Sequence, residues 1–209
     1  MTAYRLAIFD FDGTLADSSA WMLDAFNACA DKFGFRRLSR DEIEAMRGRD
    51  NREIIKELGV PMWKLPTIAK HVRALALEAE PPPLFDSIAE TLRALKAAGV
   101  KLGVVSSNSE AAIRRALGEE LAGAIDYYAC DASLFGKADK FKRLLKDAGV
   151  AASEAVSVGD ETRDIEAARK AKIACAAVTW GYATERVLRE YAPDYVFTRV
   201  ADLRATLAA

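Results

Sequence analysis

The chain has 209 residues, and its 30 basic and 31 acidic side chains leave a net charge of -1. This balance argues against a protein that binds nucleic acid, because such binding needs a clustered basic excess. The single histidine, His71, argues against a serine triad or a zinc site built from several histidines, so acid–base chemistry must come mainly from carboxylates or lysine.

The first predicted element is a buried strand, Tyr4 to Phe9, and two carboxylates follow it in the segment IFDFDGT. Side chains two residues apart in extended backbone point the same way, so Asp10 and Asp12 are expected to share a side. Gly13 then lets the chain leave the strand in a tight turn. A β-hairpin is not expected because no strand pattern follows, and a calcium loop is not expected because Leu15 stands where that loop needs glycine. We interpret the two carboxylates as the floor of a site.

Residues 17–80 are predicted to be helical. Apolar residues such as Ile54, Ile55 and Leu58 recur at helical spacing, and no strand-like alternation appears. Three consecutive prolines at 81–83 then form a stiff extended connector. We therefore predict an α/β core made of residues 1–16 and 81–209, interrupted by a helical cap made of residues 17–80.

The rest of the chain alternates between helices and short apolar strands. The predicted strands are KLGVVSSN at 101–108, EAVSVGDE at 154–161 and KIACAAVTWG at 172–181. Apolar strands alternating with helices imply right-handed crossovers and a parallel sheet that is covered on both faces. The predicted fold class is α/β, with a Rossmann-like parallel sheet core and an inserted all-helical cap.

Four carboxylates are predicted to meet at one edge of this sheet. Asp10 and Asp12 follow the first strand, Asp160 ends a later one, and Asp164 lies just beyond it; ligands of open parallel sheets bind at these carboxyl ends. Two carboxylates about 4 Å apart repel by roughly 4 kcal/mol at an effective dielectric constant of about 20. Such a cluster needs shared protons or a bound cation, and an oxygen-rich site with few protein ligands suits Mg²⁺.

The same edge carries groups suited to a phosphate. Ser106 and Ser107 follow the second long strand, and Ser109 is expected to cap the next helix, whose N-terminus would form an anion site. Lys137 opens the helix between two of the strand-end clusters, with Lys140 as the alternative source of positive charge. A carboxylate nucleophile, a second carboxylate, a cation, a lysine and an anion site together fit phosphoryl transfer.

These residues resemble the motifs of the haloacid dehalogenase-like superfamily, specifically its phosphoglycolate-phosphatase-like branch with a small helical cap. The matching segments, in order, are DFDGT at 10–14, Ser106, Lys137 and GDETRD at 159–164. The resemblance covers essentially the whole chain. One departure is LFGKADK around Lys137, where a lysine-proline form is common in the family.

The resemblance implies an Mg²⁺-dependent phosphatase that hydrolyses a small phosphorylated metabolite, such as phosphoglycolate or a similar phosphomonoester, in two steps. Asp10 would attack phosphorus and form an aspartyl-phosphate, while Asp12 would protonate the leaving oxygen and then deprotonate water. Ser106 and Lys137 would hold the phosphoryl oxygens. The implied metal ligands are Asp10, the backbone carbonyl of Asp12 and Asp160, and Asp164 would assist without touching the ion.

Substrate choice is expected to lie in the cap, where the loop MRGRDNRE resembles the family's specificity loop. Arg49 and Arg52 are candidates to pair with a substrate anion, with solvent-facing positions as the alternative. Trp180 and Tyr182 are expected either to shape a loop near the site or only to pack. The residues expected to bind the substrate are Gly13, Thr14, Ser107, Asn108, Arg49 and Arg52.

Two alternative functions remain open: a phosphosugar mutase of the same family, and a non-catalytic module that binds a phospho-ligand. Three scattered cysteines match no metal pattern and indicate a reduced, cytoplasmic protein. The N-terminus lacks the features of a signal peptide, and the apolar runs are shorter than the ~20 residues of a membrane span. The partner is thus expected to be a small phosphorylated metabolite, with no nucleic acid and no membrane, bound by a monomer or homodimer.

Overall fold

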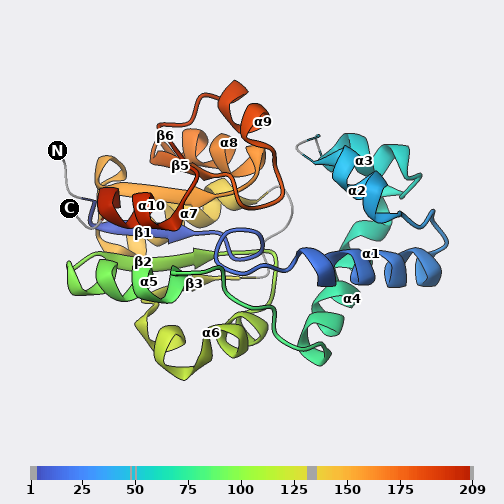
Figure 1. Cartoon of the computed structure of the whole chain (residues 1–209), viewed down its shortest axis with the longest axis horizontal. Coiled ribbons are helices and arrows are strands. Elements are labelled where there is room, and N and C mark those ends of the chain that lie inside the picture. Colours follow the sequence, from blue (N-terminus) through green and yellow to red (C-terminus); the bar gives the residue numbers. More distant parts are fainter. Residues whose placement is uncertain (1–3, 48, 50, 131–135, 208–209) are drawn as a thin grey trace.

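A computed structural model describes residues 4–47, 49, 51–130 and 136–207, with the backbone alone at 51 and 52. In this part of the chain, six strands form one parallel sheet in the order β3-β2-β1-β4-β5-β6 (Figure 1). This confirms the predicted α/β fold with a parallel sheet. The strands are β1 (Leu6–Phe9), β2 (Lys101–Val105), β3 (Tyr127–Ala129), β4 (Ala155–Gly159), β5 (Ala174–Val178) and β6 (Tyr195–Phe197).

The strand order places a ligand site beside β1. From β1 the chain moves outward through β2 and β3, and then returns to the other side of β1 with β4. In open parallel sheets, ligands bind at the carboxyl ends of the strands where the order reverses. Phe9 of β1 pairs with Val158 of β4, so Asp10 and Gly159 follow at the same level and both strands end together.

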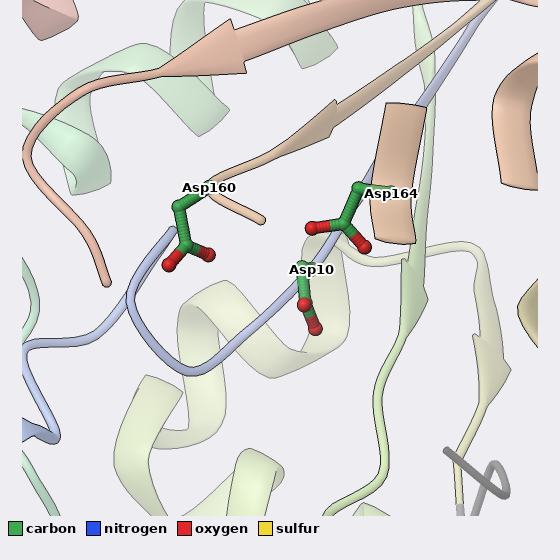
Figure 2. Close-up of side chains that lie close together, drawn as sticks. All are labelled: Asp10, Asp160 and Asp164. Atoms are coloured by element: carbon green, nitrogen blue, oxygen red, sulfur yellow. The ribbon is translucent and has the colours of Figure 1, made fainter. Parts of the chain in front are cut away.

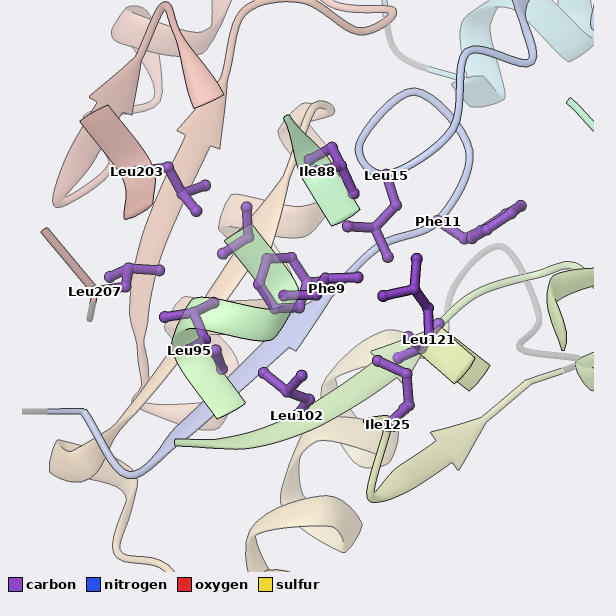
Figure 3. Packing of buried hydrophobic residues seen from close by; sticks show 14 of the residues in the cluster. Phe9, Phe11, Leu15, Ile88, Leu95, Leu102, Leu121, Ile125, Leu203 and Leu207 are labelled. Carbon is purple, nitrogen blue, oxygen red and sulfur yellow. The ribbon is translucent and has the colours of Figure 1, made fainter. Parts of the chain in front are cut away.

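The side chains of β1 alternate between two apolar layers. Ala7 and Phe9 join the cluster beneath α5 (Ile88–Ala97), α6 (Glu110–Ala124) and α10 (Val200–Leu207), part of which Figure 3 shows. Leu6 and Ile8 join the opposite cluster, whose covering helices are α7 (Lys137–Ala148), α8 (Thr162–Ala171) and α9 (Glu185–Glu190). Each fully buried leucine, isoleucine or phenylalanine stabilises the fold by roughly 1.5–3 kcal/mol, which holds the strand ends in place.

The stretch between β1 and α5 contains helices that gather beyond the end of the sheet, away from the two termini (Figure 1). They are α1 (Ser19–Phe33), α2 (Arg40–Met46), α3 (Asn51–Glu57), the 3₁₀-helix η1 (Met62–Lys64) and α4 (Leu65–Glu78).

These helices bury an apolar cluster of their own around Leu38, Met46, Leu58 and Val60. Because it is separate from the two clusters of the sheet, we propose that residues 17–80 form a cap domain and that 1–16 and 81–209 form the core, of which 1–3, 131–135 and 208–209 lie outside the described residues. Among the described helices, none has the length and apolar character needed to cross a membrane.

Candidate active site

Asp10 lies at the point where β1 leaves the sheet. Phe9 and Phe11 both belong to the buried cluster beneath α5, so the intervening residue points away from that layer. Asp10 is 6% exposed, and its Oδ1 accepts a hydrogen bond of 2.8 Å from the Phe11 backbone N–H. This bond fixes one carboxylate oxygen and leaves Oδ2 directed to other partners.

The turn after β1 brings Asp160 of the β4 end into contact with the first motif. Gly13 has a positive φ of 76°, and a Cβ at this position would lie 2.3 Å from Asp160 Oδ2. The Thr14 hydroxyl donates to Asp160 Oδ1 at 2.7 Å. Gly13 thus provides both the turn and the space for the carboxylate, and Thr14 orients it. That either residue binds substrate stays a prediction.

Three buried carboxylates come together from three elements: Asp10 after β1, Asp160 after β4 and Asp164 in the first turn of α8 (Figure 2). One oxygen from each lies within 4.8 Å of the others. The Lys137 ammonium donates to Asp10 Oδ2 and, at 2.5 Å, to Asp164 Oδ1. The fallback candidate, Lys140, instead donates to the Cys130 carbonyl, so Lys137 is the lysine that reaches the cluster.

Burial opposes the ionisation of two carboxyls in this cluster, Asp10 and Asp160. Burial raises the pKa of Asp10 to about 6 although Lys137 acts in the opposite direction, and burial also raises the pKa of Asp160 well above its usual value. Burial lowers the pKa of Lys137, but Asp10 and Asp164 outweigh that effect and the net direction is upward. Three buried carboxylates, all offering oxygen ligands, fit a hard cation such as Mg²⁺. The predicted ligands Asp10, Asp160 and Asp164 could supply these donors, and their binding of a metal stays a prediction.

Asp12 has a different environment from Asp10. Its Oδ1 is buried and has no hydrogen-bond partner within the described part of the chain. Burial raises the pKa of Asp12, and the nearby Ser18 hydroxyl and Asn108 amide oppose this shift. Burial of a carboxyl that has one unpartnered oxygen favours its protonated form. The side chain is therefore suited to donating a proton and taking one back.

The anion site predicted after β2 involves the residues between this strand and α6. Ser106 directly follows β2, is 1% exposed, and its hydroxyl accepts from the Asn108 N–H at 3.0 Å. Ser109 caps α6, as expected, by accepting from the Ala112 N–H at 3.3 Å. The N-terminus of α6 thus lies at the same edge as Asp10. The phosphate-binding roles of Ser106, Ser107 and Asn108 stay predictions.

The two arginines predicted to bind substrate differ in what the structure describes. Arg49 donates to Glu57 at 2.6 Å, in an ion pair that is partly exposed within the cap. The Arg52 side chain and Gly48, the glycine of the predicted specificity loop, lie outside the described residues. Here Arg49 has a partner inside the cap, and its contact with substrate stays a prediction.

A further charged residue at the site, Arg163, was not predicted from the sequence. Its guanidinium donates to Glu161 at 2.7 Å, and its Nε is buried with no hydrogen-bond partner among the described residues. The positive charge of Arg163 acts to lower the pKa of both Asp10 and Asp12. The available signal was its position in GDETRD, directly before Asp164 at the start of a helix that faces the cluster.

A loop after β5, residues 180–183, completes the support of Asp160. The Tyr182 N–H donates to Asp160 Oδ2 at 2.7 Å, and the Trp180 indole N–H donates to the Thr14 carbonyl at 3.1 Å. A Cβ on Gly181 would lie 2.3 Å from Asp160 Cβ. This loop therefore shapes the site, which is one of the two roles expected for it.

Known proteins resemble this chain over nearly its whole length. The sequence model of the family described as haloacid dehalogenase-like hydrolase matches residues 7–178. A phosphoglycolate phosphatase of Synechococcus elongatus is 30% identical over 198 residues, which cover 94% of this chain and 93% of that protein. A phosphoglycolate phosphatase of Agrobacterium fabrum is 32% identical, with 97% and 91% covered.

Solved structures share the fold. A haloacid dehalogenase-like family protein from Streptococcus pneumoniae superposes with a TM-score of 0.80 at 23% identity, covering 99% of both chains. At that identity the likeness concerns the arrangement of helices and strands. It agrees with the parallel sheet described above.

Proposed function

This chain belongs to the haloacid dehalogenase-like hydrolase family, and we propose that it is an Mg²⁺-dependent phosphatase acting on a small phosphorylated metabolite. The observation that carries this proposal is the position of Asp10. It ends the central strand, contacts Lys137, and lies within 4.8 Å of two further buried carboxylates. A carboxylate so placed is suited to nucleophilic attack on phosphorus.

In the first step of the proposed reaction, Oδ of Asp10 attacks phosphorus. An Asp10 O–P bond forms, and the bond between phosphorus and the alcohol oxygen of the substrate breaks. A proton passes from Asp12 to that oxygen, which leaves as an alcohol. The burial of Asp12 supports this role, because it raises the pKa of the carboxyl and so favours the protonated form.

In the second step, water attacks the phosphorus of the aspartyl-phosphate. Asp12, now ionised, accepts the proton of the water, the Asp10 O–P bond breaks, and inorganic phosphate leaves. Both enzyme carboxyls return to their starting protonation states. The net reaction consumes one water and yields the alcohol and inorganic phosphate.

The proposed metal ligands are the carboxylates of Asp10 and Asp160 and the backbone carbonyl of Asp12, with Asp164 assisting. When bound, Mg²⁺ neutralises phosphoryl oxygens and the clustered carboxylates during transfer. Lys137 contributes a fixed charge from the other side and Ser106 a hydroxyl near the α6 N-terminus. Charge neutralisation and positioning are the main requirements of phosphoryl transfer, and this set of residues can meet both.

The proposed substrate is phosphoglycolate or a similar phosphomonoester. Two relatives with this activity in their names are at least 30% identical to this chain and are covered over more than nine-tenths of their length. A pyrophosphatase of Listeria innocua is also similar, at 26% identity. The family therefore includes proteins named for more than one phosphate substrate.

A metabolite screen tests the proposal. The purified chain with Mg²⁺ is expected to release phosphate from phosphoglycolate with a higher kcat/KM than from sugar phosphates, nucleotides or pyrophosphate. Repeating the screen on Arg49→Ala tests the cap loop: a lower selectivity is expected, while unchanged selectivity would count against Arg49. No phosphate release from any compound would contradict the proposed function.

The same screen separates the two alternatives. A phosphosugar mutase would isomerise a sugar phosphate without stoichiometric release of phosphate. A module that only binds a phospho-ligand would show no turnover of an aryl phosphate with any divalent metal. The buried Oδ1 of Asp12, which has no partner among the residues that the structure describes, favours a catalytic site over a binding module.

A further inference from the structure

Arg47, which follows α2, bridges the cap and the core. Its Nε donates to the Tyr182 carbonyl and its Nη2 to the Gly181 carbonyl, both at 2.9 Å. Its Nη1 pairs with Glu44 inside the cap at 2.7 Å. Because all three nitrogens of the planar guanidinium have partners, the fork is held in one orientation. Arg47 thus fixes the cap against the 180–183 loop.

The two sides of a single peptide group connect Arg47 to Asp160. The Gly181 carbonyl, which accepts from Arg47, and the Tyr182 N–H, which donates to Asp160 Oδ2 at 2.7 Å, belong to the same planar unit. Hydrogen bonds in series polarise one another in a buried setting. The cationic guanidinium therefore both orients this N–H and strengthens its bond to the carboxylate.

The loop leaves little room for adjustment around Asp160. A Cβ on Gly181 would lie 2.3 Å from both Asp160 Cβ and the Gly13 carbonyl oxygen. The Tyr182 hydroxyl is hydrogen-bonded to the Ser18 hydroxyl at 2.7 Å, where the chain enters the cap. A shift of the 180–183 peptide groups thus has to move the carboxylate that they hold.

A second arginine, on the core side, contacts the C-terminal end of the cap. Arg115 of α6 donates to the Ala76 carbonyl at 2.8 Å and to the Ala79 carbonyl at 2.6 Å, at the end of α4. This contact lies where the chain returns to the core. Arg47 lies near the middle of residues 17–80, away from this junction, so a hinge motion about the junction would be expected to break the Arg47 bonds before those of Arg115.

We propose that Arg47 is a positioning residue that couples closure of the cap to the affinity of the Asp10–Asp160–Asp164 cluster for Mg²⁺. The inference rests on the proposed function in that Mg²⁺ is the ion bound. When the cap opens, the Gly181 and Tyr182 carbonyls become hydrogen-bonded to water instead of Arg47. The peptide group that orients Asp160 is then no longer held in place by the guanidinium. Because linkage is reciprocal, Mg²⁺ binding favours the closed cap to the same extent.

Calorimetric titration with Mg²⁺ alone, without substrate, tests this coupling. Arg47→Ala is expected to weaken Mg²⁺ binding by about five- to thirty-fold, and Arg47→Lys by less, because an ammonium can replace one of the two bonds. Excess Mg²⁺ should restore most of the turnover. The matched control is Arg37→Ala, which removes a cap arginine paired only on the surface, with Asp31; its affinity should equal that of the wild type.

Hydrogen exchange of the 180–183 amides provides a second readout that needs neither metal nor substrate. The Tyr182 amide should exchange faster in Arg47→Ala than in the wild type or in Arg37→Ala. Circular dichroism checks that each variant is folded. If Arg47→Ala is not folded, Arg47→Lys replaces it in both measurements.

The possible outcomes separate the inference from the proposed function. Equal Mg²⁺ affinity in the wild type and in a folded Arg47 variant would overturn the inference and leave the phosphatase proposal intact. Equal weakening in Arg37→Ala would overturn it too. A wild-type chain that binds no Mg²⁺ would contradict both, whereas coupling without any phosphate release would contradict only the phosphatase proposal.

Discussion

Two carboxylates that are neighbours in the first motif have different surroundings. Asp10 accepts hydrogen bonds from the Phe11 N–H and the Lys137 ammonium. Asp12 has a buried oxygen with no partner among the described residues. Burial raises the pKa of both carboxyls; the Lys137 ammonium is the main opposing charge at Asp10, where it favours the ionised form, and it acts least among the opposing groups at Asp12. This difference is the physical basis for dividing attack and proton transfer between them.

We expect Asp12→Asn to lower steady-state turnover by about 10²–10⁴-fold, the usual contribution of a general acid–base group. An aryl phosphate has a leaving group that needs no proton, so the first step should survive and the second should not. Stopped-flow measurement should then show a burst of the phenol, stoichiometric with enzyme, followed by slow release.

The matched control for this variant is Asp17→Asn, because Asp17 is exposed and its carboxylate bonds only locally, to Ser19. It should keep wild-type turnover. Wild-type rates in Asp12→Asn, or a strong loss without any burst, would contradict the assigned role.

The sequence was sufficient to predict the acidic cluster but not its supports. Asp10, Asp160 and Asp164 follow strands whose apolar patterns are plain, and Lys137 opens a helix between them. The Tyr182 N–H is a backbone donor, and backbone donors have no residue signature. Arg47 and Arg49 are both arginines of one loop, and only their geometry separates the one that contacts the core from the one that pairs inside the cap.

At the scale of elements, the turn after β1 has to fit closely against the end of β4. Gly13 meets two requirements there: a positive φ of 76° and room for the Asp160 carboxylate, which would lie 2.3 Å from a Cβ. Gly149, at the end of α7, has a similar φ of 62° but open space around it. A comparison of substitutions at Gly13 and Gly149 therefore distinguishes the effect of backbone strain from the effect of a steric clash with Asp160.

We expect Gly149→Ala to lower the free energy of unfolding by about 1 kcal/mol, the cost of the left-handed backbone alone. Gly13→Ala should lower it further and should also weaken Mg²⁺ binding, because Asp160 has to move. Denaturant unfolding and Mg²⁺ calorimetry measure the two effects. Equal destabilisation of both variants with unchanged Mg²⁺ affinity would show that Gly13 matters only for its backbone.

Two edge strands were not predicted. β3 (Tyr127–Ala129) and β6 (Tyr195–Phe197) have three residues each, too few for an alternating pattern to emerge. Their pairing depends on the neighbouring strand rather than on their own composition. The longer strands β1, β2, β4 and β5 are almost wholly buried. Their apolar runs were sufficient to predict the parallel sheet correctly.

At the scale of the whole molecule, the cap closes over the core. A crevice of about 10 Å³ reaches Asp12 and Asn108, with Trp21 of α1 and Ala76 of α4 on its cap side. That volume holds about one water molecule. We therefore expect that the cap moves to admit a phosphorylated metabolite, and such a motion would break the Arg47 contact.

The stability of the metal-free protein should depend on pH through the buried carboxyls. The pKa of Asp10 rises from its usual 3.8 to about 6, so the folded state binds this proton more tightly. Its contribution to stability is complete below about pH 4 and is lost as pH rises through about 6. Mg²⁺ stabilises the ionised carboxylates, so it should raise Tm more at about pH 7.5 than at about pH 5. Thermal melts with and without Mg²⁺ measure this, and equal shifts at both pH values would contradict it.

The central claim is that Asp10 is the nucleophile of a phosphatase, and phosphate release by Asp10→Asn tests it most directly. The measurement compares this variant with the wild type on the same aryl phosphate at saturating Mg²⁺, after circular dichroism confirms that both are folded. We predict a loss of about three orders of magnitude or more, as for other enzymes that lose their nucleophile. Turnover within tenfold of the wild type would contradict the account.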